Sequence, residues 1–405
     1  MMTVRRATVV LLLATACRDV RRDRAIVTDS SGVQITRFTR SVSTIGSTWT
    51  VAPEPVLDIG VQEGESAFEL DRVVGARRLS DGSIVIADGG SGELRLFDSG
   101  GRFIRSMGGK GAGPGEFQSV AWVQVAALDT VLVVDSDLRR VTAFTPSGAL
   151  QWTTLIEGTG YAWPGNVRLP DGTFVLLTET GDVWQRIRSG QARAGQTARN
   201  TAVLARYAPS GVLLDTLGRF RGYEEAILER DGRPATTYPP WGRLITHSLG
   251  KDRVYVGTQE SAEVRAYLPD GTLAAIIRWP AGDLDITTED IDEFNAVQFE
   301  LAGPDSVARQ AIVARTKSLP LPDARPAYGR VLVDEVGLLW ISEPHIPIAA
   351  PRQWTAIQPG RGVAGRLEVP GHFDVYEIGL DYLLGRWTDE IGVQHVRILR
   401  LYRQE

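Results

Sequence analysis

Short apolar segments alternate with glycine-containing turns along most of the chain. Within residues 79–107, an Asp-Gly turn leads into an apolar segment at 84–87, a polar loop follows, and further apolar segments lie at 94–97 and 103–107. Segments of this length are typical of β-strands, and strands this short become stable only within a larger sheet. The pattern therefore predicts strands that occur in sets.

The same arrangement returns further along the chain. An aromatic residue closes a strand and a turn ending in glycine follows it, at 97–100, 144–148, 207–211 and 267–271. Proline and glycine favour turn conformations, so each marker predicts a hairpin. A spacing of about 40 to 65 residues per unit is in the range of propeller blades. The first strands of the units are expected near Val73, Val120, Val167, Leu244, Val331 and Val375.

These units predict an all-β chain, a six-bladed β-propeller of four-stranded blades with a helical insertion. The last unit, 372–402, contains only three strands, and an open sheet edge favours aggregation. Residues 49–60 end in a pattern that resembles the outer strand at 105–108. We expect this N-terminal strand to pair with the last blade and close the ring.

Three segments resemble a bacterial six-bladed β-propeller family related to NHL-repeat proteins, whose members are often predicted lipoproteins. The segments are 29–35, the glycine-rich 108–117 and 382–393. The likeness extends over roughly residues 29–402. It implies propeller architecture and a location in the cell envelope more than it implies any chemistry.

The N-terminus has the features of an export signal. Arg5 and Arg6 precede an apolar segment at 7–16 that is too short to span a bilayer, and Cys17 follows directly. Cys17 is the only cysteine, so it has no intramolecular disulfide partner. The segment resembles a lipobox, and diacylation of Cys17 would anchor the protein to a membrane. The alternative is an ordinary secretory signal with a cysteine at this place by chance.

The expected division of the chain follows from this signal. It is a signal peptide at 1–17, a charged tether at 18–32 and the propeller at 33–405. The protein is expected to be exported to the cell envelope and lipid-anchored. With a formal net charge of -5, nucleic acid is not expected as a partner, because phosphate binding requires a basic surface.

Motifs for catalysis and metal binding are sparse. The four histidines have no zinc-site spacing, and no Gly-x-Ser-x-Gly motif occurs. Asp88 and Asp135 end equivalent strands, where a carboxylate either binds a divalent cation or accepts hydrogen bonds from loop amides. The second role is favoured, so no cofactor is predicted, with a divalent cation as the alternative.

Long insertions are expected on one face. In a four-stranded blade, the loops after the second and fourth strands share a face, and the expected insertions 179–200, 219–241, 280–326 and 343–362 all follow such strands. Helices are expected to begin near Thr287 and Asp305. Several long loops on one rim favour a binding surface there.

The candidate ligand-binding residues lie in or beside these loops. They are Trp163, Trp184, Trp241, Trp354, His345 and Arg352, together with Arg139 and Arg140 in a short loop on the same rim. Exposed tryptophan and arginine are common anchors for partners and for flat ligands such as sugars. The alternative is that each tryptophan packs beneath its own loop and that the two loop arginines are only solvated.

Three functions fit these features. The first is a membrane-tethered, non-catalytic propeller that binds a protein, peptide or glycan at the insertion-bearing face. The second is an enzyme of the metal-dependent lactonase or lyase type, with Asp and His residues from several blades around the channel. The third is a structural component of a larger envelope assembly.

Overall fold

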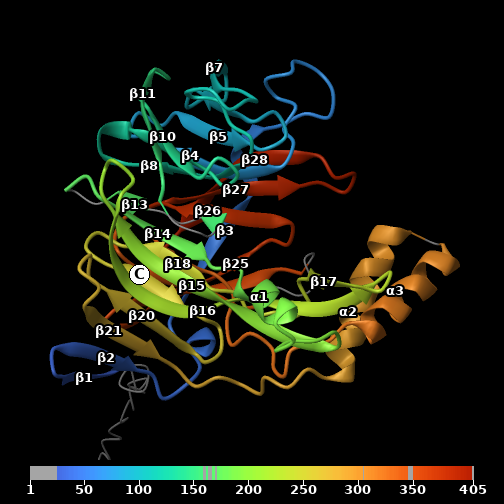
Figure 1. Ribbon diagram of the computed structural model, residues 1–405. Helices are drawn as coiled ribbons and strands as arrows, with labels where there is room; N and C mark the ends of the chain where they lie inside the picture. The colour runs from blue at the N-terminus through green and yellow to red at the C-terminus, as the bar shows by residue number, and fades with distance from the viewer. Residues whose placement is uncertain are drawn as a thin grey trace, which may run out of the picture.

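The computed structural model describes residues 25–157, 161–162, 167–168, 171–303, 305–344 and 350–403. The strands of this described part form five sheets, two of which are four-stranded antiparallel meanders (Figure 1). The first contains β4 (Val73–Arg78), β5 (Ile84–Asp88), β6 (Glu93–Phe97) and β7 (Phe103–Gly108). The second contains β8 (Val120–Val125), β9 (Val131–Asp135), β10 (Arg140–Phe144) and β11 (Leu150–Leu155).

Two further sheets keep this unit and add strands to it. In one, β12 (Tyr161–Ala162) and β13 (Val167–Arg168) both pair with β14 (Phe174–Glu179), followed by β15 (Gln196–Tyr207), β16 (Leu213–Arg230) and β17 (Arg233–Thr237). The other contains β18 (Thr246–Leu249), β19 (Val254–Gly257), β20 (Glu263–Tyr267) and β21 (Leu273–Arg278). Its edge is extended by β2 (Val33–Arg37), which pairs in parallel with β21, and by β1 (Ile26–Ser30).

The fifth sheet joins the two ends of the chain. It contains β22 (Val331–Val333), β23 (Leu339–Ser342), β24 (Arg352–Gln358), β25 (Gly362–Val369), β26 (Phe373–Ile378), β27 (Tyr382–Thr388) and β28 (Gln394–Tyr402). Between β25 and β28 lies β3 (Ser47–Ile59), which is antiparallel to β28. The predicted pairing of 49–60 with the last strand is therefore confirmed. The sequence did not predict that β3 also begins parallel to β25.

The first strands of neighbouring sheets lie side by side. β4 contacts β8 and β26, and β22 contacts β18 and β26. Strands begin close to each of the six positions expected from the repeat. Four-stranded units packed through their first strands are the arrangement of propeller blades. The chain therefore has a β-propeller-like fold.

Apolar side chains fill the spaces between the sheets. Val85 of β5, Val123 of β8 and Val133 of β9 are fully buried in one cluster between the first two sheets. The strands carry apolar residues on both faces, and in β5 the two faces pack in different clusters, with Ile86 in one and Val85 in the other.

The glycine-rich segment 108–117 connects β7 to β8. Gly108 has a φ of 82°, and a side chain there would clash with the ring of Phe117. Arg140 of β10 donates hydrogen bonds to the carbonyl oxygens of Ala112 (3.0 Å) and Gly113 (2.8 Å). The segment is thus a tight connection between neighbouring sheets, and a buried arginine holds its backbone.

The added elements lie on one side of the sheets (Figure 1). They are α1 (Asp182–Arg188), the hairpin of β16 and β17, α2 (Thr288–Ala302) and α3 (Ser306–Ser318). The two helices expected in 280–326 are confirmed. The expected insertion at 219–241 is not a loop, since β16 continues to Arg230 and pairs with β17. Part of 343–362 is also not a loop, because residues 352–358 form β24, which pairs with both of its neighbours.

Residues 26–30 form β1, so the strands begin within the segment expected to be the tether, 18–32. Its partner β2 continues the sheet that contains β21. In the described part of the chain, none of the helices combines the length and the apolar character needed to cross a membrane.

Candidate functional site

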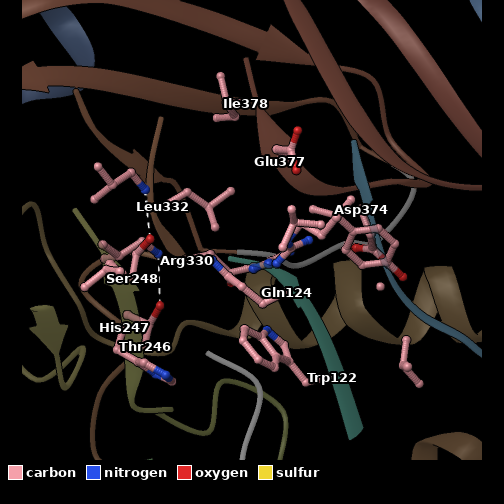
Figure 2. A pocket seen from close by; sticks show the side chains of 18 of the residues that line it. Trp122, Gln124, Thr246, His247, Ser248, Arg330, Leu332, Asp374, Glu377 and Ile378 are labelled. Atoms are coloured by element: carbon pink, nitrogen blue, oxygen red, sulfur yellow. Dashed lines mark hydrogen bonds between the residues drawn. The ribbon is translucent and has the colours of Figure 1, made fainter. Parts of the chain in front are cut away.

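A cavity of about 980 Å³ lies where the first strands of the sheets meet, and we call it the central cavity (Figure 2). Its wall is formed by residues of β4, β8, β18, β22 and β26. Tyr223 of β16 and Gln259, which follows β19, also line it. The polar side chains of Thr246 and Ser248 accept hydrogen bonds from the backbone of β22, at 2.9 Å each. These side chains join neighbouring sheets at the wall of the cavity.

Asp374 is one of the carboxylates in the wall, and Arg386 forms an ion pair with it. Arg386 also donates to the carbonyl oxygen of Val73 at 3.2 Å. The Tyr376 hydroxyl donates to the same oxygen at 2.7 Å. Burial raises the pKa of Tyr376 to about 12, so this phenol remains a neutral donor at physiological pH.

Glu377 is a second carboxylate in the wall. It accepts a hydrogen bond from the Tyr382 hydroxyl and a long one, 3.4 Å, from the backbone N–H of Arg78. The Arg78 guanidinium lies 4.8 Å from the centre of the Tyr382 ring. Burial raises the pKa of Glu377, whereas the charge of Arg77 lowers it. Of the four carboxylates that line the cavity, those of Glu335, Asp374, Glu377 and Asp381, the structure therefore gives Asp374 and Glu377 partners within the protein.

Two arginines of the central cavity, unlike Arg386, are not paired with a carboxylate in the described part of the chain. Arg77 donates to the carbonyl oxygen of its neighbour Ala76 at 2.8 Å, and Arg330 donates to that of Val375 at 2.7 Å. Among the described residues, neither guanidinium forms an ion pair with a carboxylate. Burial lowers the pKa of Arg77, the attraction of Glu377 raises it, and repulsion by Arg330 lowers it further. Figure 2 shows Arg330 between the strand of Asp374 and the strand of His247 and Ser248.

A buried carboxyl group lies beside the cavity, at the base of the added hairpin. Glu179 is only 4% exposed and accepts a hydrogen bond from the backbone N–H of Tyr223 at 2.5 Å. Burial raises its pKa to about 7, the Tyr223 hydrogen bond lowers it, and the nearby charge of Glu225 raises it. Burial likewise raises the pKa of Glu225. Glu179 thus changes its charge near neutral pH.

Two predicted binding residues are not on the rim. Trp354 and Arg352 belong to β24, and they are 1% and 7% exposed. Trp354 packs with Trp340 and Leu367 in the core of the fifth sheet. Burial lowers the pKa of Arg352 to about 10. The prediction of exposed anchors was wrong here because this segment pairs as a central strand.

Trp241 was also expected to be an exposed anchor, but it is buried. Its ring lies 5.6 Å from that of Phe294 in α2, so it packs beneath the helical insertion. Trp241, Trp279 and Tyr328 line a second cavity of about 390 Å³ there. Trp184 in α1 is 38% exposed, in agreement with its predicted place on the surface, and its role as a ligand contact stays a prediction.

The remaining predicted residues are dispersed. Arg140 is buried and engaged by the glycine-rich segment, so the prediction that it meets a ligand was wrong. Arg139 is exposed. Trp163 and His345 lie outside the described residues. Among the six predicted residues that the structure describes, it therefore does not bring all together at one site.

The carboxylates of Asp88 and Asp135 hold loops in place through hydrogen bonds from backbone N–H groups. Asp88 accepts hydrogen bonds from the backbone N–H groups of Gly90 and Ser91, at 2.9 Å each. Asp135 accepts from Gln118 at 2.7 Å and from Leu138 at 2.8 Å. The favoured interpretation of these carboxylates is confirmed. Within the described ranges, no group of three or more His, Cys, Asp or Glu residues is placed to hold a metal ion.

The sequence reasoning missed the charged residues of the central cavity. Arg77, Arg330 and Glu377 were not considered, although charged residues at first-strand positions were visible in the sequence. Such positions border the central channel of a propeller. A comparison of the first strands with each other would have shown these charged residues.

No protein-family model matches the chain, and no match is found among curated proteins. A solved member of the DUF4221 family from Bacteroides vulgatus has a TM-score of 0.50 and 10% sequence identity. The similarity covers 89% of this chain and 100% of that one. A protein of Bacteroides fragilis that carries the description of an exported protein has a TM-score of 0.46, with 11% identity over 92% and 100% of the two chains. Virginiamycin B lyase from Staphylococcus aureus has a TM-score of 0.42, with 9% identity over 85% and 98%.

At such low identity, these similarities concern the fold alone. The first of them agrees with the arrangement of the sheets and with the contacts between their first strands. The chain therefore shares a β-propeller-like architecture with solved proteins.

Proposed function

We propose that the protein is a closed six-bladed β-propeller that is exported, tethered to a membrane through Cys17, and binds a protein, peptide or glycan at its insertion-bearing face. Binding involves no catalytic step. The surface is built from α1, the hairpin of β16 and β17, and the pair α2 and α3, around the mouth of the central cavity.

The main support is that these added elements gather on one side (Figure 1). The four-stranded units would be complete without the helices, β17 and the part of β16 that pairs with β17, since each propeller blade needs only four strands. Tyr223 belongs to the added hairpin strand and also lines the central cavity. Extra elements that border a cavity on one face are typical of a binding surface carried by a rigid scaffold.

Closure of the ring is supported by β3, which supplies the strand that the last blade lacks. The blades are the two four-stranded sheets, the four-stranded units within the two six-stranded sheets, and the two halves of the eight-stranded sheet. A closed ring leaves no exposed inner edges and holds the binding face rigid.

The excision of α2 and α3 tests the binding face. Arg325 donates its backbone N–H to the carbonyl oxygen of Leu284 at 2.7 Å, so residues 286–323 can be replaced by a short Gly-Ser linker. We expect the wild type to bind members of a glycan or peptide array and the excised variant to lose this binding while its circular dichroism is retained. A chain that begins at Val33, without the edge strand β1, is the control. Equal binding by the excised variant and the wild type would contradict the proposal.

The tether is tested separately with Cys17→Ser. The wild type is expected in the membrane fraction, with a diacylated cysteine at its mature N-terminus by mass spectrometry. The variant is expected in the soluble exported fraction. An unmodified N-terminus beyond Cys17 in the wild type would exclude the lipid anchor.

A further inference from the structure

We propose that the central cavity binds a single carboxylate group between the guanidinium groups of Arg77 and Arg330, so that the ligand is acidic. This inference rests on the proposed binding function and names the chemical class of the ligand. The carboxylate belongs either to an acidic sugar or to the C-terminus of a peptide.

Arg77 and Arg330 have no carboxylate partner within the described residues. Each donates one hydrogen bond to a backbone carbonyl, and neither has an ion pair among the described residues. Both side chains are only partly exposed. An enclosed cation without a partner is unfavourable, and proteins keep such groups mainly where a ligand supplies the opposite charge. Arg77 and Arg330 line the same cavity, so both charges act on the same region.

Two of the four acids in the wall are already engaged by other side chains. Asp374 is paired with Arg386, and Glu377 accepts a hydrogen bond from Tyr382. These acids therefore do not neutralise Arg77 and Arg330 by direct contact. A ligand carboxylate can accept paired hydrogen bonds from a guanidinium, which is the geometry that arginine favours.

The charge of the wall also selects among anions. Asp374 and Glu377 line the same cavity, and a dianionic phosphate would be repelled by them more than a monoanion. Neutral polar groups such as Gln124, Thr246 and Ser248 are available for hydroxyl or amide groups of the ligand. The cavity, about 980 Å³, is large enough for a disaccharide or a short peptide end.

The experiment is calorimetric titration of the full chain with small probes. The probes are glucuronate and galacturonate with glucose as neutral control, N-acetyl-dialanine with its amide as control, and inorganic phosphate. We expect at least one carboxylate to bind. Arg77→Gln and Arg330→Gln should each weaken this binding by at least about tenfold, because each removes a charge-assisted contact. Arg400→Gln, at an exposed position of β28, should bind as the wild type does.

Thermal unfolding separates this role from a structural one. Without ligand, Arg77→Gln should unfold at or above the temperature of the wild type, because it removes an unpaired enclosed charge. A strong decrease in this temperature would instead assign Arg77 a structural role and contradict the proposal. With a binding carboxylate added, only the wild type and Arg400→Gln should gain stability.

Each outcome decides a specific point. Binding of acidic sugars alone assigns the carboxylate to a glycan, and binding of the dipeptide alone assigns it to a peptide terminus. Equal binding of phosphate, or wild-type affinity in Arg77→Gln and Arg330→Gln, overturns the carboxylate site. If the array in the excision experiment yields only neutral ligands, this inference fails while the proposed function stands. If nothing binds in either experiment, both fail.

Discussion

The backbone N–H of Val73 donates a hydrogen bond to Oε1 of Gln394 at 2.7 Å, although the two residues are separated by 321 positions. Val73 begins the first strand of the first sheet, and Gln394 begins the last strand of the chain. The carbonyl oxygen of Val73 is bound by Tyr376 at 2.7 Å. Side chains of the last four-stranded unit thus satisfy both polar groups of a backbone unit at the start of the first.

This seam predicts that Gln394→Ala destabilises the whole protein. Val73 is 1% exposed, so its N–H would lose its partner with limited access to water. We expect a loss of about 1 to 2 kcal/mol in the free energy of unfolding, measured by urea denaturation. Gln358→Ala, at an exposed position of β24, should change it by less than about 0.5 kcal/mol. Equal stability of both variants would mean that the seam hydrogen bond contributes nothing.

The glycine-rich connection gives a second prediction. Arg140→Met removes the hydrogen bonds to Ala112 and Gly113 and leaves these carbonyl oxygens without that donor. A loss of about 2 to 3 kcal/mol in unfolding free energy is expected. Its neighbour Arg139 is exposed, and Arg139→Met should have a small effect in the same denaturation experiment. A larger effect at Arg139 than at Arg140 would reverse the assignment.

A third prediction concerns pH. Because the pKa of Glu179 is raised to about 7, the folded protein holds a proton that the unfolded chain releases near pH 4.5. The free energy of unfolding should therefore fall as pH rises from about 4.5 to about 7, by roughly 3 kcal/mol from this group. Glu179→Gln keeps an acceptor for Tyr223 and should remove this part of the pH dependence, which makes it more stable than the wild type at pH 8.

Glu54→Gln, at an exposed position of β3, is the control for the pH experiment and should retain the wild-type slope. Denaturation curves at several pH values between 4 and 8 measure the difference. A slope that is the same in Glu179→Gln and in the wild type would show that this carboxyl group titrates at its ordinary value.

The helical insertion gives a fourth prediction. Thr316 of α3 donates a hydrogen bond to Oδ1 of Asn295 in α2 at 2.8 Å, and both side chains are buried. Thr316→Val leaves the Asn295 oxygen without this donor and should weaken the contact between the helices by about 1 to 2 kcal/mol. Hydrogen exchange should become faster in α2 and α3 and stay unchanged in the sheets. Val307→Ala, at a position that is 72% exposed, should leave exchange as it is.

The local pattern of the sequence was sufficient to predict the strands and the pairing of β3 with β28. The repeated turns predicted that the first strand of the first unit begins near Val73. The likeness between 57–60 and 105–108 correctly predicted the pairing of β3 with β28. Turns and strand alternation depend on neighbouring residues, so they can be read from short segments. The two helices of the insertion were predicted for the same reason.

The candidate site could not be predicted in this way. The segment around Trp354 was expected to belong to a long insertion, but both neighbouring strands, β23 and β25, pair with it and bury it. Arg77 and Arg330 line one cavity only because their separate sheets pack side by side. Contacts between distant segments depend on how the sheets are placed, which a repeat pattern does not specify.

The position of β3 has a consequence for how the molecule is made. The segment is synthesised early, yet its principal partner β28 is the last strand of the chain to emerge. A nascent or prematurely terminated polypeptide therefore carries β3 with unpaired backbone N–H and C=O groups along one edge. Chaperones and proteases act on such exposed segments. This pairing of β3 therefore has to wait until β28 has been synthesised.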